Sequence, residues 1–257
     1  MNFKLALVTG ASSGLGLALC ERLSNQGIPL LLTGRDPERL AAAAKTFPSV
    51  VESIALDLSK DRRPLLELIR KHTPDLVLNN AGCGLYGPAL MHPLSDQMDL
   101  LEINAAAAIE IALEAARALH SRNRPGVICN ISSTAGEIPV PTMALYAAAK
   151  ACVTSFSQSF DAEMRPFGIR VLVSLPGPID TGFAAHASNN GFIQNSRFAL
   201  KKEKAARLIW NQIEKRKGIQ VIGWRNQLGA ALLKLMPRSA SNWLLQRSLN
   251  ERYTLDM

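Results

Sequence analysis

The sequence predicts an α/β fold, a doubly wound parallel sheet of about seven strands with helices on both faces, and three observations support this prediction. The chain opens on an apolar run, Lys4–Thr9, that leads through a glycine-rich turn into a helical pattern. Apolar strand-like runs then alternate with helical patterns, as in parallel sheets whose strands are joined by crossover helices. The 257 residues suffice for one large core, and no Pro/Ser-rich linker or repeat divides them. We therefore expect a single domain, residues 1–257.

The first strand and the glycines behind it are the most informative local pattern. KLALVT (Lys4–Thr9) is apolar enough for a buried parallel strand, and a helix begins near Gly14. Gly10 permits a tight turn, Gly14 lets the backbone approach a pyrophosphate, and Gly16 lets the helix pack closely on the sheet. The free N–H groups at the start of this helix would face the phosphates of a dinucleotide. A structural turn that contains three glycines is the alternative interpretation.

The remaining elements follow in alternation. Six further strands are predicted at Pro29–Thr33, Ile54–Leu58, Leu76–Leu78, Val127–Ile131, Val171–Leu175 and, at the sheet edge, Gln220–Trp224. Asp36 and Pro37 form a typical helix start, an N-cap followed by a proline at the first helical position. Asp99–Leu119 has the apolar period of a long helix, with Asn104 as a polar break inside it.

One later helix carries a pair of groups suited to proton transfer. Tyr146 and Lys150 (YAAAK) are four residues apart and therefore neighbours on one helix face. A free tyrosine has a pKa of about 10, and an adjacent ammonium favours the phenolate, so we expect Lys150 to lower the pKa of Tyr146. Such a phenol exchanges protons more easily near neutral pH. The alternative is that Tyr146 and Lys150 are neighbours on an exposed helix surface and take no part in a reaction.

Several motifs together resemble the short-chain dehydrogenase/reductase family, in its short single-domain branch. They are TGxxxGxG at Thr9–Gly16, NNAG at Asn79–Gly82 and YxxxK at Tyr146–Lys150. Twelve residues separate Ser133 from Tyr146, as between the family's catalytic serine and tyrosine; Ser132 lies one residue too early and receives a supporting role at most. The resemblance covers about Lys4 to Thr181 and implies an NAD(P)-binding Rossmann-type domain.

The resemblance implies a catalytic set of Asn104, Ser133, Tyr146 and Lys150. Ser133 would hold a carbonyl oxygen while hydride moves from C4 of the nicotinamide. Tyr146 would give its proton to the nascent alkoxide or take one in the reverse direction. Lys150 would also bond the ribose hydroxyls and pass protons through water toward Asn104.

The resemblance also implies cofactor contacts where the strands end. Asp57 and Leu58 resemble the pair that contacts the adenine ring, although Asp57 could equally cap a strand end. The segment from Pro176 to Thr181 resembles the motif that closes over the nicotinamide carboxamide, although Thr181 could simply cap the next helix. The full set of expected contacts is Thr9, Gly10, Ser12, Ser13, Gly14, Leu15, Gly16, Arg35, Asp57, Leu58, Asn80, Ala81, Gly82, Tyr146, Lys150, Pro176, Gly177 and Thr181.

The residues after the second strand favour NADP(H) as the cofactor. In the family, an acidic residue at the position of Gly34 would bind the ribose 2′-hydroxyl and select NAD. Here that residue is glycine, and a guanidinium at Arg35 can fork onto a 2′-phosphate. Asp36 lies about where the general fingerprint expects an acid, but its role as a helix cap explains it without a ligand.

Composition excludes several other classes of protein. The four cysteines and four histidines have no metal-ligand spacing, so we expect free thiols in a reducing compartment and no metal site. We find neither a cleavable signal nor an apolar stretch of membrane length, and we expect a cytoplasmic protein. The net charge is +8, but the basic residues are dispersed and no recognition motif accompanies them, so a nucleic-acid partner is not expected. We expect a homo-oligomer, either a dimer or a tetramer.

Two segments leave alternatives open. Residues 183–200, with Phe183, Phe192, Ile193 and Phe198, suit a flexible lid over an apolar substrate and equally suit a surface loop that buries a few aromatics. Residues 225–257 form a basic amphipathic extension in which Leu228 and Leu232 share a helical face. Such helices can lie on anionic membranes, but we favour packing on the protein, a neighbouring subunit or the substrate cleft.

The sequence therefore predicts an NADP(H)-dependent oxidoreductase that interconverts a carbonyl and a secondary alcohol on an apolar small molecule. The rival hypothesis is a catalytically silent NADP(H)-binding sensor or scaffold of the same fold. The complete set of Asn104, Ser133, Tyr146 and Lys150 weighs against that rival, because a sensor has no need of a tuned phenol.

Overall fold

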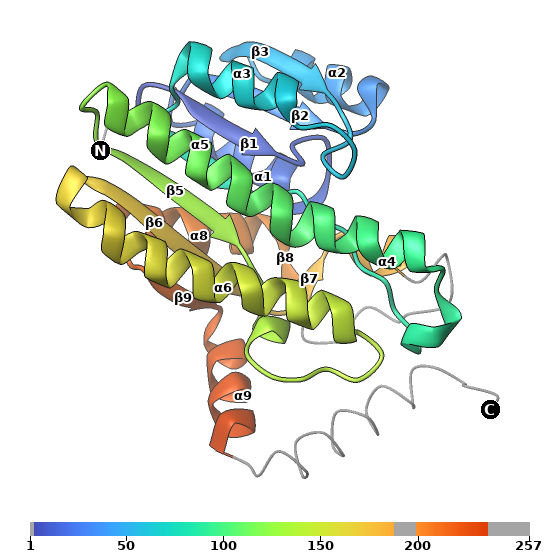
Figure 1. The fold of residues 1–257 in the computed structure, drawn as a ribbon. Helices are drawn as coiled ribbons and strands as arrows, with labels where there is room; N and C mark the ends of the chain where they lie inside the picture. Colours follow the sequence, from blue (N-terminus) through green and yellow to red (C-terminus); the bar gives the residue numbers. More distant parts are fainter. Residues whose placement is uncertain (1–2, 188–198, 236–257) are drawn as a thin grey trace.

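The computed structural model describes residues 3–187 and 199–235, and its centre is a sheet of seven parallel strands (Figure 1). The order across the sheet is β3-β2-β1-β4-β5-β6-β9. The strands are β1 Ala6–Thr9, β2 Leu30–Gly34, β3 Val50–Ala55, β4 Leu76–Asn79, β5 Gly126–Ile131, β6 Ile169–Pro176 and β9 Ile219–Ile222. The chain winds outward from β1 to β3 and returns to β4 beside β1, so the topological switch point lies between β1 and β4. This confirms the predicted doubly wound fold.

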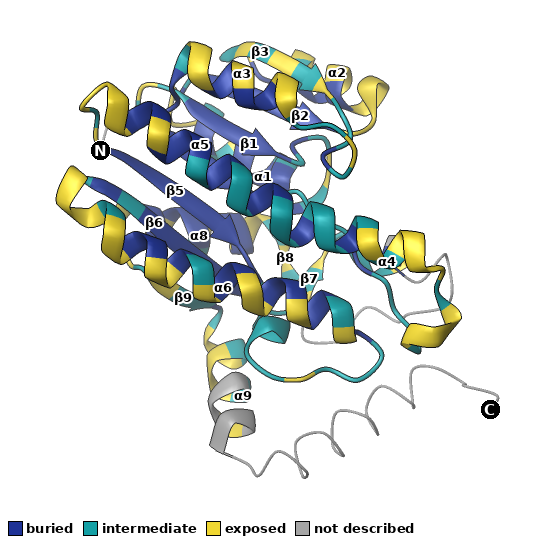
Figure 2. Cartoon of the chain, viewed as in Figure 1, coloured by how far each residue is buried: buried dark blue, intermediate teal, exposed yellow. Residues whose placement is uncertain are grey.

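Helices cover both faces of the sheet. One face carries α1 (Gly14–Ser24), α2 (Pro37–Thr46) and α8 (Lys202–Glu214), and the other carries α3 (Arg63–His72), α5 (Ala107–Ser121) and α6 (Ala144–Met164). Successive strand residues alternate between the two cores: Ala6 and Val8 face α1 and α8, whereas Leu7 faces α3 and α5. The central strands are therefore buried on both sides (Figure 2).

The strand bounds differ from the prediction by at most two residues at each end, except in β3. β3 occupies Val50–Ala55 rather than Ile54–Leu58, because it is the edge strand and its residues alternate between half-buried and exposed. Such a strand lacks the continuous apolar run that marks the central ones. At the opposite edge, β9 lies as predicted but ends at Ile222, since Gly223 takes a positive φ of 91° and turns the chain into α9 (Trp224–Leu235).

The predicted long helix begins earlier and is not uniform. α4 (Leu94–Leu101) continues through a π-helical turn at Glu102–Ala106 into α5. A small two-stranded sheet pairs β7 (Ile179–Asp180) with β8 (Leu200–Lys201) beyond the end of β6, and α7 (Phe183–Ala187) lies between them in sequence.

The described part of the C-terminal extension leaves its apolar residues exposed on this chain. Trp224, Leu228 and Leu232 form an apolar stripe along α9, and 65%, 55% and 55% of their surfaces are exposed. Packing of Leu228 and Leu232 on a neighbouring subunit stays a prediction. The centre of the expected lid, with Phe192, Ile193 and Phe198, lies outside the described residues, as does the rest of the C-terminal extension, residues 236–257.

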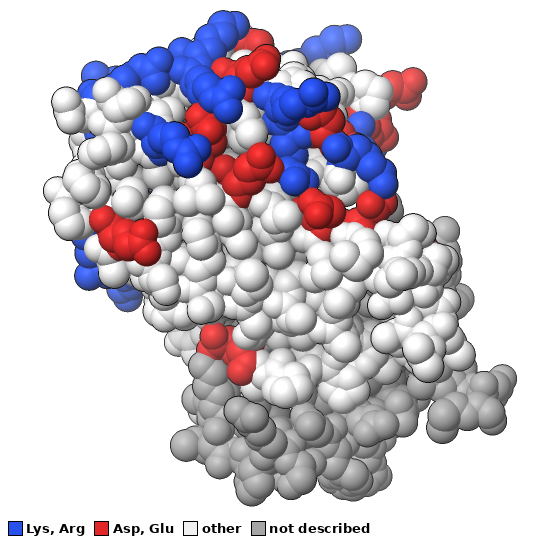
Figure 3. All heavy atoms as spheres, viewed as in Figure 1, with Lys and Arg blue, Asp and Glu red and all other residues white. Residues whose placement is uncertain are grey.

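The charged surface in the orientation of Figure 3 is mixed in sign. Basic and acidic side chains gather over the end of the molecule that carries α3, where Arg70 bonds Glu114 at 2.8 Å and Arg62 bonds Glu102 at 3.0 Å. Few charges are visible over α4 and α6 in this view. None of the helices in the described ranges is both long and apolar enough to span a bilayer.

Candidate active site

The glycine turn after β1 has the geometry of a phosphate cradle. Gly10 and Gly14 have φ values of +66° and +54°, which favour glycine. A Cβ on Gly16 would lie 2.0 Å from the carbonyl oxygen of Gly10, so only glycine fits there. Ser13 precedes α1 without a capping bond from its side chain, so it leaves the first-turn N–H groups of the helix without a side-chain cap.

The NNAG loop after β4 is tied to this turn by hydrogen bonds. The Thr9 hydroxyl accepts from the backbone N–H groups of Asn80 (3.0 Å) and Ala81 (2.9 Å). The Asn80 amide donates in return to the carbonyl of Thr9 at 2.9 Å. Asn79 bonds Asn130 on β5 at 2.8 Å. These hydrogen bonds therefore hold the ends of β1, β4 and β5 together at the topological switch point, independently of any contact with a cofactor.

Asn104 lies in the π-helical turn with its side chain directed to the same edge. Its amide N–H donates to the carbonyls of Cys83 (2.7 Å) and Leu100 (3.0 Å). Its Oδ1 is buried and has no hydrogen-bond partner among the described residues. A Cβ on Gly82 would lie 2.6 Å from this oxygen and 3.5 Å from Nζ of Lys150, so glycine leaves open the space between them.

Ser133, Tyr146 and Lys150 meet at the end of β5. The Ser133 hydroxyl is hydrogen-bonded to the Tyr146 phenol, and Nζ of Lys150 lies 5.6 Å from the centre of the Tyr146 ring. The Lys150 ammonium donates to the carbonyl of Ile131 at 3.1 Å. Ser132 bonds the Lys150 carbonyl at 2.8 Å instead of facing Tyr146, which agrees with a supporting role.

The electrostatics of this cluster differ from the expectation. Burial raises the pKa of Tyr146 above its usual value, and the hydrogen bond from Ser133 offsets this only in part. The expected lowering by Lys150 is therefore wrong, because desolvation of the buried phenolate is the largest effect on this pKa. Burial lowers the pKa of Lys150 to about 8. The structure thus holds a protonated phenol beside an ammonium that gives up its proton unusually easily.

The adenine end of the candidate site contains Arg35 and Asp57. Arg35 is exposed just beyond β2, and Ser12 lies against Gly34, whose Cβ would be 3.0 Å from the Ser12 hydroxyl. Although burial raises the pKa of Asp57, hydrogen bonds from Ser59 and the positive charges of Arg35 and Lys60 lower it below its usual value. Asp57 thus caps the end of β3, the alternative left open by the sequence.

Other residues near the predicted cofactor site also stabilise the fold. Asp36 caps α2 through the N–H of Arg39 at 3.0 Å, as predicted. The side chains of Leu15 and Leu58 are buried in the two cores, which leaves their backbones for any ligand contact. Thr181 accepts from the N–H of Phe183 at 3.3 Å and so caps α7. It also lies against Gly14, since a Cβ there would be 3.3 Å from the Thr181 Cβ.

The sequence missed a contact at Gly177. A Cβ on this residue would lie 2.5 Å from the side-chain carbon of Asn226, so α9 closes against the Pro176-Gly177 turn. Asn226 is held there by its bond to the Ile222 carbonyl at 2.8 Å. No sequence motif marks Asn226, because its position depends on how α9 leaves the sheet.

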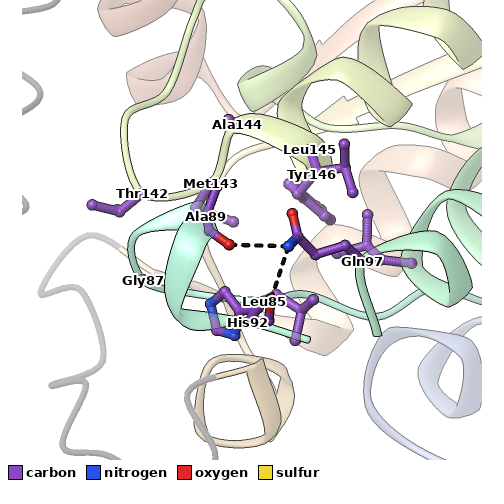
Figure 4. A pocket seen from close by; sticks show the side chains of 11 residues that line it. Leu85, Gly87, Ala89, His92, Gln97, Thr142, Met143, Ala144, Leu145 and Tyr146 are labelled. Atoms are coloured by element: carbon purple, nitrogen blue, oxygen red, sulfur yellow. Dashed lines mark hydrogen bonds between the residues drawn. The ribbon is translucent and has the colours of Figure 1, made fainter. Parts of the chain in front are cut away.

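A pocket beside Tyr146 was also missed. It is lined by Leu85, Gly87, Ala89, His92, Gln97, Leu100, Thr142, Met143, Ala144, Leu145 and Tyr146 (Figure 4). Leu85, Gly87, His92, Thr142 and Met143 belong to irregular segments, so the sequence offered no periodic signal for them. The ring of Phe183 lies 5.8 Å from that of Tyr146.

These residues together fit a nicotinamide dinucleotide. The cradle accepts no Cβ at Gly16, the buried Oδ1 of Asn104 lies close to Lys150 across Gly82, and Thr181 approaches the cradle from the end of β7. In the described parts of the chain, no cluster of His, Cys, Asp and Glu could hold a metal ion.

Comparison with known proteins decides the family. The sequence model of the short chain dehydrogenase family matches residues 4–191. The chain is a short-chain dehydrogenase/reductase, and hence an oxidoreductase. A 3-ketodihydrosphingosine reductase from Bacteroides thetaiotaomicron is 30% identical to it over 244 residues, covering 93% of this chain and 85% of that protein.

Solved structures of short-chain dehydrogenases share the fold. One from Sphingobium yanoikuyae in complex with NADPH is 26% identical, with a TM-score of 0.78 over 91% of this chain and 96% of that chain. One from Burkholderia phymatum in complex with NAD has a TM-score of 0.80 at 22% identity, over 90% of this chain and 92% of that chain, and supports the fold alone. The family thus includes proteins that bind either nicotinamide cofactor.

Proposed function

We propose that this short-chain dehydrogenase/reductase uses NADP(H) to interconvert a carbonyl and a secondary alcohol on an apolar substrate. The observation that carries the proposal is the convergence of Ser133, Tyr146 and Lys150 at the end of β5. There the phenol bonds Ser133, and the ammonium lies near the ring. A hydroxyl, an acid and an ammonium at one buried point are the groups that carbonyl reduction needs.

Each residue has a distinct task in the proposed reduction. Bound NADPH would supply the hydride to the carbonyl carbon. Ser133 would hold the carbonyl oxygen, and Tyr146 would donate its proton to that oxygen as negative charge develops. Tyr146 stays protonated at neutral pH, so a proton is available for this step. Lys150, with a pKa of about 8, would bond the ribose and pass a proton by way of water toward Asn104.

The preference for NADP(H) is supported by the end of β2. Gly34 offers no carboxylate to the ribose, and the exposed Arg35 is free to fork onto a 2′-phosphate. The carboxylate of Asp57 lies near enough to Arg35 for the two charges to interact. It already accepts a hydrogen bond from the Ser59 hydroxyl, so it competes less with a 2′-phosphate for the Arg35 guanidinium.

An apolar substrate is supported by the surroundings of Tyr146. Leu85, Leu100 and Met143 line the adjoining pocket, and the Phe183 ring lies near the phenol. The Bacteroides relative is named for a keto form of dihydrosphingosine, so a long-chain ketone is the first substrate class to test.

The test is a panel of long-chain ketones, steroid ketones, quinones and small aldehydes, with NADPH and NADH consumption followed by absorbance. We expect turnover of apolar ketones with NADPH and much slower turnover with NADH. NADPH binding without turnover across the whole panel would overturn the proposal and favour the silent sensor. Equal rates with both cofactors would overturn only the cofactor preference.

A further inference from the structure

The pocket beside Tyr146 differs from a plain apolar cavity. It leaves a cavity of about 20 Å³ between the loop after β4, helix α4 and the start of α6. That space accommodates a single group about the size of a water molecule and not a ring system. Among the described residues that line it, none is Lys, Arg, Asp or Glu.

Two polar atoms of the lining stand without partners. Nε2 of His92 and Oγ1 of Thr142 are buried, and neither forms a hydrogen bond with any described residue. Buried polar atoms are nearly always paired, and the exceptions need a reason such as a role in binding. A ligand group bound in the pocket next to Tyr146 would pair both atoms and would provide such a reason.

Both residues are held in place by their backbones. The Gln97 amide donates to the carbonyls of Ala89 and His92, each at 3.0 Å, which fixes the short turn that carries His92 (Figure 4). The N–H of Gly87 donates to the carbonyl of Thr142 at 2.9 Å. Thr142 has a φ of +63°, an unfavourable conformation for a β-branched residue. Strain of this kind persists where surrounding contacts impose it, often at functional sites.

The chemistry of the pocket selects a neutral ligand group. An imidazole nitrogen and a hydroxyl can each donate or accept, depending on tautomer and rotation. A phosphate or carboxylate would find no cation among the lining residues, and an ammonium would find no carboxylate. A hydroxyl group matches both atoms, because it donates to one and accepts from the other.

We propose that His92 and Thr142 recognise a hydroxyl group that the substrate carries close to its reacting carbonyl. The group lies close to the carbonyl because Tyr146, the proposed proton donor, lines the same pocket. The enzyme is then selective for hydroxyketones over ketones of equal chain length. This inference rests on the proposed function and names the specificity-determining residues for it.

The test compares 1-hydroxy-2-octanone with 2-octanone, a pair that differs by one hydroxyl. We expect wild-type kcat/KM to favour the hydroxyketone by roughly 10-fold to 100-fold, the range for one buried hydrogen-bonding group. His92→Phe and Thr142→Val keep side-chain shape and should reduce this ratio toward one, mainly through KM. Thr142→Ser should retain it. His120→Gln, at the far end of α5 on an exposed residue, is the matched control and should leave the ratio unchanged.

Two results would contradict the inference. A wild-type ratio near one would refute the inference. If both ketones are turned over in that case, the proposed function still holds. A ratio that survives both His92→Phe and Thr142→Val shows that other residues read the hydroxyl. If neither ketone turns over, ligand-observed NMR with 1,2-octanediol and 2-octanol decides the matter. Preferential binding of the diol, lost in His92→Phe, supports the pocket's role even if the proposed function fails, and equal binding refutes it.

Discussion

The buried ammonium of Lys150 makes a quantitative prediction about stability. Lys150 is 5% exposed, and burial lowers its pKa from 10.5 to about 8. The folded state therefore loses this proton at a lower pH than the unfolded state does. Between the two pKa values the unfolded chain binds more protons, so the free energy of unfolding gains a contribution that rises with pH. Each pKa unit corresponds to about 1.36 kcal/mol, which gives about 3 kcal/mol over the whole interval.

The perturbation that isolates this contribution is Lys150→Met, which keeps the aliphatic stem and removes the charge. Urea denaturation of both proteins at pH 7, 8.5 and 9.5 gives the difference in unfolding free energy at each pH. We expect wild type to gain about 2 kcal/mol relative to the variant between pH 7 and pH 9.5. Other titrating groups cancel in this difference.

A matched control is Lys204→Met, which removes a charge from an exposed position of α8. Its difference from wild type should stay constant over the same range. If the Lys150→Met difference is equally constant, Lys150 does not titrate as a buried ammonium, and the proton path assigned to it fails. The variant should also lose most turnover, since Lys150 is proposed to hold the ribose as well as the proton path.

Two further predictions concern the proposed chemistry. Tyr146→Phe should abolish nearly all turnover, because it removes the proton donor, while NADPH affinity measured by fluorescence titration should change only a few fold. Tyr86→Phe is the control. Wild-type rates in Tyr146→Phe would refute the assignment of Tyr146 as the acid. Arg35→Ala should weaken NADPH binding by about 1.5–3 kcal/mol, the value of a charge-assisted hydrogen bond, and leave NADH binding almost untouched. Arg39→Ala, one turn into α2, serves as its control, and equal losses for both cofactors would exclude a 2′-phosphate contact.

The sequence predicted the central sheet well for a physical reason. Strands buried on both faces must be apolar throughout, so β1, β4, β5 and β6 are visible as short continuous runs. The edge strand β3 is half exposed, and its alternating residues carry a weaker signal that displaced the prediction by several residues. Capping by Asp36 was predictable because it involves only neighbouring residues.

The candidate site was predictable only where its residues form motifs. Ser133, Tyr146 and Lys150 could be found from their spacing, and the structure brings them together. The raised pKa of Tyr146 was not predictable, because desolvation depends on residues distant in sequence that close over the ring. His92 and Thr142 lie on irregular segments, and their unpaired atoms become visible only when the two segments meet.

The π-helical turn that contains Asn104 has a consequence for how this chain tolerates change. Such a turn accommodates one more residue than a regular helix would over the same length. Deleting a residue between Glu102 and Ala106 would restore regular winding over the same length, so the two halves of the helix would keep their faces. Ala112 and Ala115 would stay on the sheet and Leu100 at the site edge, whereas Asn104 would lose the wide turn that presents its side chain. A deletion in this turn should therefore cost activity more than stability, whereas a deletion within α5 would turn one half of the helix against the other by about 100°.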